Sequence, residues 1–219
     1  MQNLLTANNI NKTFKLGNQS IKVLQDVAIA IKHAEFVAIM GKSGSGKSTL
    51  ISILAGLDLP DTGSVMLNNQ DLVQLSEDEL AIKRQTDISF VFQSFHLIPT
   101  LTVAENIGFP LKIARNFKQN IVNELLKKVE LSHRANSFPH QLSGGEKQRT
   151  AIARALVTQP KILFADEPTG NLDEKNAQSV MRLLIDLQQE YQSTLVVVTH
   201  DPAIASLADR IIHIVDGRI

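Results

Sequence analysis

A glycine- and serine-rich segment, GKSGSGKST (residues 41–49), has the residue types and spacing of a phosphate-binding loop. It follows the apolar run FVAIM and precedes the helical pattern TLISILAG, which is the strand–loop–helix context that such a loop needs. Glycines let backbone N–H groups turn onto a phosphate, and a helix start adds partial positive charge. Lys47 can reach the β- and γ-phosphates of a nucleotide, and the Ser48 hydroxyl can bind Mg²⁺. A chance match is the alternative, but the flanking strand and helix argue against it. The predicted contacts are Gly41, Lys42, Ser43, Gly44, Ser45, Gly46, Lys47, Ser48 and Thr49.

Two adjacent acids, Asp166 and Glu167, end the apolar run in ILFADEP (162–168). Successive residues of an extended chain point to opposite sides, so the two carboxylates can do different jobs. Asp166 suits the shell of groups just outside magnesium's direct ligands at a P-loop, and Glu167 suits a general base or water-orienting group for an attacking water. Pro168 is expected to keep Glu167 extended. The alternative is that the two acids are simply exposed to solvent at a strand end. The P-loop upstream favours a catalytic role instead.

Two more polar residues follow apolar runs, Gln93 in FVFQSF and His200 in VVVTHD. Taken alone, each is at least as well explained by a structural role: Gln93 as an amide that caps a strand, and His200 as a histidine at a strand end. Together with Gly41 and Asp166, they place polar groups after four expected strands. Ligands of open α/β sheets bind at the carboxyl ends of the strands, so we expect these groups along one sheet edge.

A second helix start, in LSGGEKQR (142–149), also has features of an anion site. Ser143 and Glu146 have the spacing of a capping box, and a capped helix alone would explain them. It would not explain Gly144 and Gly145, because glycine in a helix costs up to about 1 kcal/mol relative to alanine. The two glycines indicate that something approaches the backbone closely, and a second anion site is the inference.

The composition excludes several classes of protein. Lys and Arg number 22 and so do Asp and Glu, which gives no general attraction to nucleic acid. The chain has no cysteine, which excludes disulfides, thiol catalysis and Cys-bound zinc. It begins without a signal-peptide pattern, and no apolar run approaches the about 18 residues that span a bilayer. We therefore expect any work at a membrane to require a partner.

The elements that must position these residues alternate between short apolar runs and longer helical patterns. This alternation predicts an α/β fold with a mostly parallel sheet covered on both faces. Strands are expected near residues 4–10, 27–32, 35–40, 64–67, 88–92, 161–165, 194–198 and 211–215. Helices are expected near 47–55, 77–84, 102–115, 119–129, 144–158, 175–190 and 202–207. We expect one domain over residues 1–219, with a core of 1–92 and 161–219 and a helical subdomain at about 93–160.

These segments resemble, over nearly the whole chain, the ATP-binding subunit of ABC transporters. GKSGSGKST matches the Walker A motif, ILFADEP the Walker B motif, and LSGGEKQR the signature motif, which is specific to that family. Gln93 matches the Q-loop, GNLD (170–173) the D-loop, and His200 the switch histidine. The resemblance implies a P-loop NTPase fold with N-terminal antiparallel β elements and an inserted helical subdomain. It also implies hydrolysis of ATP with Mg²⁺ as cofactor.

The resemblance also implies a role for each matching residue. The implied catalytic residues are Lys47, Gln93, Glu167 and His200, and the implied magnesium-site residues are Ser48, Gln93 and Asp166. Further implied nucleotide contacts are Ser143, Gly144, Gly145, Glu146 and Asp173. Phe14 lies where the family usually places an aromatic that stacks on adenine, with an ordinary core phenylalanine as the alternative. Ala34 stands where many relatives have glycine, and little effect is expected.

The family resemblance further implies two partners. Such cassettes pair head to tail, so that the signature motif of one copy faces the ATP held by the P-loop of the other. FVFQSFHLIPTLTVAENI (90–107) and ADEPTGNLD (165–173) are similar to the branch containing LolD, MacB, YbbA and, more distantly, FtsE. That branch implies an integral membrane permease of FtsX/MacB type, with the chain bound peripherally at the cytoplasmic face of the inner membrane.

The unusually apolar loop SFHLIPTL (94–101) is the expected docking segment for the permease. The implied functions are lipoprotein release, export or mechanotransmission, and no nucleic-acid partner is expected. Two alternatives stay open, a soluble ABC ATPase that acts on ribosomes or DNA and an inactive regulatory cassette.

Overall fold

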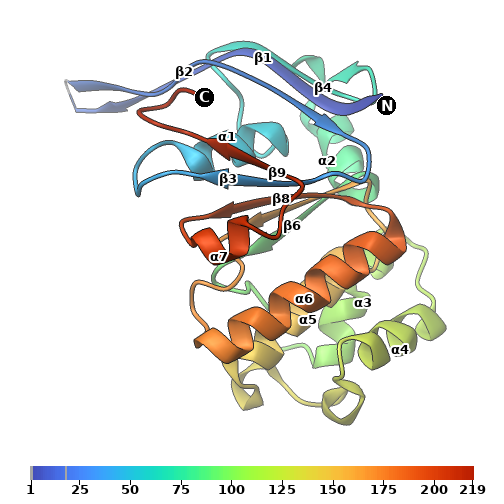
Figure 1. Ribbon diagram of the computed structural model, residues 1–219. Coiled ribbons are helices and arrows are strands. Elements are labelled where there is room, and N and C mark those ends of the chain that lie inside the picture. Colours follow the sequence, from blue (N-terminus) through green and yellow to red (C-terminus); the bar gives the residue numbers. More distant parts are fainter. Residues whose placement is uncertain (1, 18) are drawn as a thin grey trace. The chain divides into compact units, whose positions relative to one another are not determined.

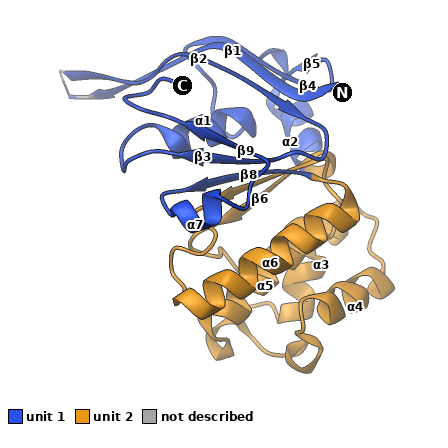
Figure 2. Cartoon of the chain, viewed as in Figure 1, with its two compact units in different colours: residues 1–84, 194–219 blue, residues 85–193 orange. Residues whose placement is uncertain are grey.

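The computed structural model describes residues 2–17 and 19–219. The chain divides into two compact units, residues 1–84 with 194–219 and residues 85–193 (Figures 1 and 2). Each unit contains parallel strands and helices, so the expected α/β class is confirmed. The division of the chain into a core and a helical subdomain stays a prediction.

The first unit has a parallel arrangement of strands at its centre. Strand β3 (Phe36–Met40) pairs in parallel with β8 (Thr194–Thr199) and with β9 (Arg210–His213). Every residue of β8 and the first four of β3 are buried, as strands covered on both faces should be. Helix α1 (Lys47–Leu54) follows β3, and helix α7 (Pro202–Ala205) follows β8.

An antiparallel sheet completes the first unit, with strand order β2-β1-β4-β5. Strands β1 (Asn3–Leu16) and β2 (Gln19–Lys32) are much longer than expected, because they extend as a hairpin. The first four residues of β2 are all exposed, so no apolar periodicity marks this extension in the sequence. The remaining elements are β4 (Thr62–Leu67), the short strand β5 (Gln70–Asp71), which was not expected, a 3₁₀ turn (Leu72–Gln74) and α2 (Glu77–Thr86).

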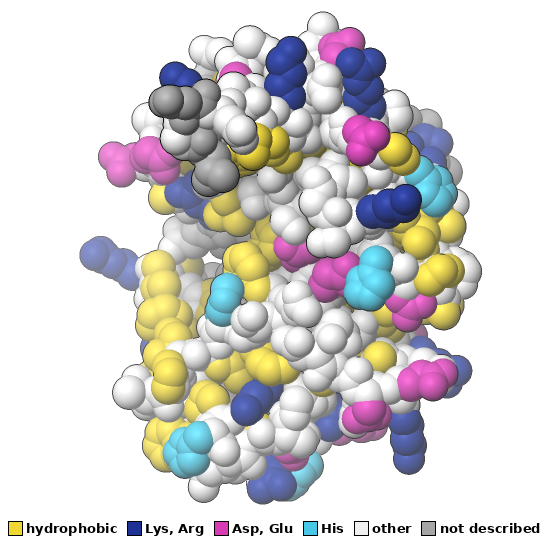
Figure 3. All heavy atoms as spheres, turned by 90° about the vertical axis from the view of Figure 1, so that its left-hand side faces the viewer, with side chains coloured by type: hydrophobic (Ala, Val, Ile, Leu, Met, Phe, Trp, Pro, Cys, Tyr) yellow, Lys and Arg dark blue, Asp and Glu magenta, His cyan; other side chains and the backbone are white. Residues whose placement is uncertain are grey.

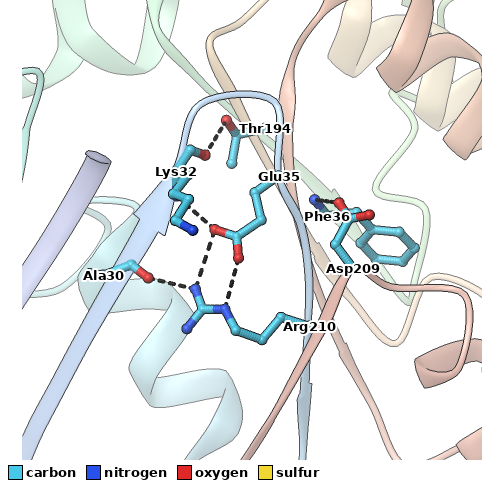
Figure 4. A network of polar contacts seen from close by, with 7 residues as sticks. All are labelled: Ala30, Lys32, Glu35, Phe36, Thr194, Asp209 and Arg210. Atoms are coloured by element: carbon cyan, nitrogen blue, oxygen red, sulfur yellow. Dashed lines mark hydrogen bonds and ion pairs between the residues drawn. The ribbon is translucent and has the colours of Figure 1, made fainter. Parts of the chain in front are cut away.

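A polar network joins the amino ends of β3 and β9 to the end of β2 (Figure 4). Glu35 Oε1 accepts from Arg210 Nε at 2.7 Å, and its Oε2 accepts from the backbone N–H of Lys32 at 2.7 Å. Arg210 also donates to the carbonyl oxygen of Ala30 at 2.6 Å. Burial acts to raise the pKa of Glu35, but the hydrogen bonds from Arg210 and Lys32 outweigh it and leave the pKa below its ordinary value. The network fixes the strand ends opposite to the predicted P-loop.

The second unit consists of two parallel strands and four helices. Strand β6 (Ile88–Phe92) pairs in parallel with β7 (Ile162–Asp166). The helices are α3 (Val103–Ile113), α4 (Gln119–Lys128), α5 (Gly144–Leu156) and α6 (Glu174–Tyr191). Helix α5 packs against both α3 and α6. Two 3₁₀ turns, Ser132–Arg134 and Pro139–Gln141, were not expected.

The surface carries charges of both signs without a bulk excess of either. Acidic and basic side chains are interspersed with hydrophobic ones across the face drawn in Figure 3, in keeping with the equal totals of 22. Within the described residues, no helix combines the length and apolarity that a membrane crossing requires.

Candidate functional site

The loop between β3 and α1 is folded around the side chain of Lys47. Its Nζ donates to the carbonyl oxygens of Gly41 at 2.8 Å and Lys42 at 2.9 Å, and the lysine is buried. Gly44 and Gly46 have φ values of +78° and +100°, which glycine adopts readily and other residues rarely do. Helix α1 begins directly after Gly46. The predicted strand–loop–helix context is confirmed, and the loop conformation depends on its glycines.

Two of the loop glycines also allow close packing. A Cβ on Gly41 would lie 2.4 Å from the carbonyl oxygen of Ile214, and one on Gly46 would lie 2.7 Å from that of Val23. The buried Oγ of Ser45 has no hydrogen-bond partner among the described residues. A buried hydroxyl without an acceptor is costly, so this position fits a ligand that brings oxygen atoms, such as a phosphate.

The predicted P-loop residues and His200 come together within the first unit. A cavity of about 470 Å³ is lined by Gly41, Lys42 and Ser45 and also by His200 and His213. The parallel register explains this, because Met40 lies opposite both Thr199 and His213. His213 was missed in the sequence, although it ends a strand (RIIH) as His200 follows one. The exposed side chains of Ser43 and Ser48 and the half-buried Thr49 belong to the same segment.

Phe14 is not a core residue. Its side chain is 44% exposed on β1, and the Lys12 ammonium lies 5.3 Å from the centre of its ring. Lys12 is held in place by Asp58 Oδ1 at 2.8 Å. The alternative of an ordinary core phenylalanine is therefore wrong, and stacking on adenine stays a prediction.

In the second unit, the parallel pairing of β6 with β7 brings two predicted site segments to one sheet edge. Phe92 lies opposite Asp166, so Gln93 leaves the sheet beside Asp166 and Glu167. The expectation that Pro168 holds Glu167 extended is wrong, because Glu167 has φ +46°. Pro168 disfavours only the right-handed helical region for the residue before it. A tight turn follows β7, closed by the N–H of Gly170, which donates to the Glu167 carbonyl oxygen at 3.0 Å. This turn places Glu167 in the left-handed region. Such a residue costs about 1–2 kcal/mol, and strain of this kind is frequent at functional sites.

Gln93 is tied to the GNLD segment within the same unit. Its Nε2 lies 3.4 Å from Asn171 Oδ1, and Asn171 Nδ2 donates to the carbonyl oxygen of Gln93 at 3.0 Å. A Cβ on Gly170 would lie 2.8 Å from Gln93 Nε2. Asn171 was not singled out in the sequence, and it links the expected Q-loop and D-loop residues.

The predicted capping box at the start of α5 is confirmed. Ser143 Oγ accepts from the N–H of Glu146 at 3.3 Å, and Glu146 Oε2 accepts from the N–H of Ser143 at 2.8 Å. Glu146 Oε1 accepts from Arg134 Nε at 2.9 Å. The hydrogen bond from Ser143 contributes most to lowering the pKa of Glu146 below its ordinary value. Both carboxylate oxygens of Glu146 are thus engaged within the chain.

The close approach inferred from Gly144 and Gly145 is present, and the chain itself makes it. A Cβ on Gly144 would lie 3.2 Å from Leu172, and one on Gly145 would lie 3.1 Å from Asn176 Oδ1. Asp173 is the N-cap of α6 and accepts from the N–H of Asn176 at 3.0 Å and from its Nδ2 at 2.6 Å. These bonds lower the pKa of Asp173, the side-chain bond most. The nucleotide contacts of these residues stay predictions.

Two residues missed in the sequence hold the loop that follows β6. Arg154 on α5 donates to the carbonyl oxygens of Phe95 at 2.8 Å and His96 at 2.5 Å, both of which have positive φ. Buried Asn106 on α3 accepts from the N–H of Ile98 at 2.8 Å and donates to its carbonyl oxygen at 3.1 Å. The Arg154 contacts join residues 58 and 59 positions apart, and such contacts leave no local pattern in the sequence.

The predicted magnesium-site residues supply the right donor atoms. Among the described residues, no three or more His, Cys, Asp or Glu side chains are grouped so that they could hold a metal ion. Magnesium does not need one, because it keeps several waters and is bound by one or two protein groups plus substrate phosphates. The hydroxyl of Ser48, the amide oxygen of Gln93 and the carboxylate of Asp166 are oxygen donors, so this set fits Mg²⁺.

Known proteins match the chain over almost its full length. The family model described as ABC transporter matches residues 24–170. The lipoprotein-releasing system ATP-binding protein LolD of Acinetobacter baylyi is 45% identical over 218 residues, which cover 98% of this chain and 96% of LolD. The macrolide export ATP-binding/permease protein MacB of Chlorobaculum tepidum is 46% identical over 212 residues, which cover 95% of this chain but 32% of MacB.

A solved structure also matches the fold of this chain over nearly its whole length. The dimeric, post-hydrolysis structure of the ATP-binding cassette MJ0796 with ADP and Pi has a TM-score of 0.90 and 44% sequence identity. The match covers 98% of this chain and 96% of that one. The predicted family and its LolD- and MacB-like branch are confirmed. The chain belongs to the ABC transporter family.

Proposed function

We propose that the chain binds and hydrolyses ATP as the cassette subunit of an ABC transport complex and drives an FtsX/MacB-type permease. The observation that carries this proposal is the loop built around Lys47, with glycines at positive φ and His200 lining the adjoining cavity. The relatives support it, since LolD is named an ATP-binding protein and MacB an ATP-binding/permease protein.

Each predicted site residue has a role in this proposal. Lys47 and the backbone N–H groups of the P-loop hold the phosphates of ATP, as P-loop residues do. Ser48, Gln93 and Asp166 would hold Mg²⁺, which would supply positive charge to offset that of the phosphates. Glu167 takes the proton from the attacking water, and His200 contacts the transferred phosphate.

Dimerisation is the second part of the proposal. The MJ0796 cassette, which shares this fold, forms a dimer with ADP and Pi bound. By analogy, two copies of this chain pair head to tail, and the start of α5 in each copy binds the γ-phosphate held by the other. A symmetric pair completes two such sites at once.

ATP turnover tests the catalytic assignment. We expect Glu167→Gln to lower the hydrolysis rate by about 100-fold or more while ATP binding persists, because a positioned general base contributes about that much. Glu174→Gln is the matched control, since it removes an exposed acid from the start of α6. Wild-type turnover in Glu167→Gln would show that the base is another group.

Light scattering tests the role of the α5 start in the dimer. The Glu167→Gln background should reach dimer mass with ATP and Mg²⁺. Adding Gly145→Ala should destabilise the fold, because its Cβ would lie 3.1 Å from Asn176 Oδ1. Adding Asn176→Ala should relieve that crowding and restore stability. The double variant keeps the N–H of residue 145 and should still dimerise, whereas Gly144→Pro, which removes an N–H at a helix position that tolerates proline, should not. Normal dimerisation of folded Gly144→Pro would remove the start of α5 from the nucleotide site.

Co-purification tests the membrane role. Tagged Glu167→Gln, extracted gently from native membranes with ATP and Mg²⁺, should carry a permease with it. The apolar loop at 94–101 is the proposed docking segment, and Leu97→Asp there should lose the permease while ATP binding is retained. Recovery of ribosomal or nucleic-acid proteins alone would favour the soluble alternative instead.

A further inference from the structure

A second cavity, of about 440 Å³, lies within residues 85–193. One face of α6 contributes Lys175, Ser179, Arg182 and Asp186, spaced four, three and four residues apart as a helix face requires. Arg149 from α5 and the chain around the end of α4 complete the lining. Figure 1 shows α4, α5 and α6 in the helical part of this unit. None of the lining residues belongs to the proposed nucleotide contacts.

Three of the four cations in the lining have no salt bridge among the described residues. Lys128, Arg149, Lys175 and Arg182 face only two acids in the lining. Lys128 is engaged by Glu190, which lies outside the lining, and donates to the hydroxyl of Tyr191 at 3.0 Å. No salt bridge joins the other three cations to an acid in the described part of the chain. In a protein of zero net charge, this is a local excess of positive charge.

Arg149 adds an observation that points to a ligand. Its Nε is buried and has no hydrogen-bond partner among the described residues. Buried polar groups are nearly always paired, and a charged donor without an acceptor is especially costly. Because Arg149 also lines this cavity, a ligand that brings acceptor oxygens there could pair with its guanidinium.

We propose that this cavity binds a phosphate-bearing ligand with at least two negative charges. The planar guanidinium groups of Arg149 and Arg182 match phosphate oxygens in pairs of parallel hydrogen bonds. Lys175 adds a point charge, and the amide of Gln178 and the hydroxyl of Ser179 add donors. The volume lies within the range of small-molecule sites, and a lining this polar suits an ion rather than an apolar compound.

Calorimetric titration with inorganic triphosphate tests the proposal. The full chain carries Lys47→Ala, so that the P-loop no longer competes for the probe. We expect binding that Lys175→Gln/Arg182→Gln weakens by about tenfold or more, because both charged contacts are lost. The matched control is Lys22→Gln/Arg115→Gln, which removes two exposed cations from outside the cavity. Thermal unfolding verifies that both double variants are folded, which we expect because all four substituted side chains are exposed.

The phosphate could come from a soluble compound or from a lipid headgroup, and a second arm separates these sources. In this arm the chain is sedimented with phosphatidylcholine vesicles that contain phosphatidic acid. If the chain sediments with the vesicles and Lys175→Gln/Arg182→Gln does not, the site binds a lipid headgroup. Triphosphate binding without sedimentation assigns it to a soluble ligand. The proposal is overturned if triphosphate does not bind the Lys47→Ala chain, or if both double variants bind it equally. Neither result depends on ATP hydrolysis, so the proposed function is tested separately.

Discussion

Arg154 holds a strained part of the loop after β6, and its replacement gives a sharp test of this structure. Phe95 and His96 have φ values of +61° and +46°, and each such residue costs about 1–2 kcal/mol. Arg154 donates to the carbonyl oxygens of both residues, at 2.8 and 2.5 Å. Arg154→Met keeps the apolar stem of the side chain and removes both donors. The variant therefore isolates the guanidinium.

The magnitude follows from these two hydrogen bonds. Hydrogen bonds to a charged group contribute about 1.5–3 kcal/mol each, or about 3–6 kcal/mol together. The left-handed strain of the two loop residues amounts to about 2–4 kcal/mol, so the hydrogen bonds are of the size needed to offset it. Without them the loop can relax, which limits the loss, and we expect Arg154→Met to lower the free energy of unfolding by about 2–3 kcal/mol. Burial lowers the pKa of Arg154, but an arginine stays protonated at neutral pH, so the loss should not vary near pH 7.

Urea unfolding combined with hydrogen exchange checks this expectation. Arg154→Met should unfold at lower urea with an unchanged m-value, and the amides of residues 94–98 should exchange faster than in the wild type. Arg182→Met is the control, because it makes the same replacement at an exposed position of α6 and should leave both readouts nearly unchanged. If Arg154→Met matched the wild type in stability and in loop exchange, the proposed link between the guanidinium and the loop strain would be refuted.

Three further predictions concern Asn106, the P-loop glycines and Glu35. Asn106→Leu should lower the free energy of unfolding by about 2–4 kcal/mol in urea titrations, because it leaves the N–H and C=O of Ile98 without their partner; a loss below that of a surface substitution would contradict it. Gly46→Ala should abolish ATP binding in a fluorescent-nucleotide titration, since its Cβ would lie 2.7 Å from a carbonyl oxygen, whereas Gly44→Ala, with φ +78° but nothing within 4 Å, should cost only backbone strain. Glu35 has a lowered pKa in the folded chain, so its contribution is present above its ordinary pKa of 4.5 and is lost as the pH falls through the lowered value. Urea midpoints of Glu35→Gln should therefore fall less than those of the wild type between neutral pH and about pH 3; parallel curves would argue against the network in Figure 4.

The elements that depend on local patterns could be predicted from the sequence. The apolar runs of β3, β7 and β8 are almost entirely buried, and the expected strands there match within one residue or so at each end. The capping box of α5 forms with the predicted partners. These features require only residues that are close in the chain, which is why a single sequence shows them.

Features that depend on distant partners could not be predicted. The β1–β2 hairpin extends over exposed residues whose alternation carries no apolar signal. Arg154 reaches a loop 58 and 59 residues earlier, and nothing in its own helix marks that contact. The backbone conformation of Glu167 could be predicted only in part. The proline after it disfavours the right-handed helical region, but the turn that follows, which the sequence did not show, selects the left-handed region.

Gly144 and Gly145 show how one sequence signal can answer two structural demands. Their missing side chains admit Leu172 and Asn176, so the chain's own packing accounts for the absence of a Cβ. Their backbone N–H groups pose a separate demand, since the first amides of a helix have no partner within it. Ser143 Oγ caps the N–H of Glu146, while no described residue accepts from the N–H of Gly144 or Gly145. Packing therefore explains the residue type, and the unpaired amides are what make this helix start suitable for a phosphate.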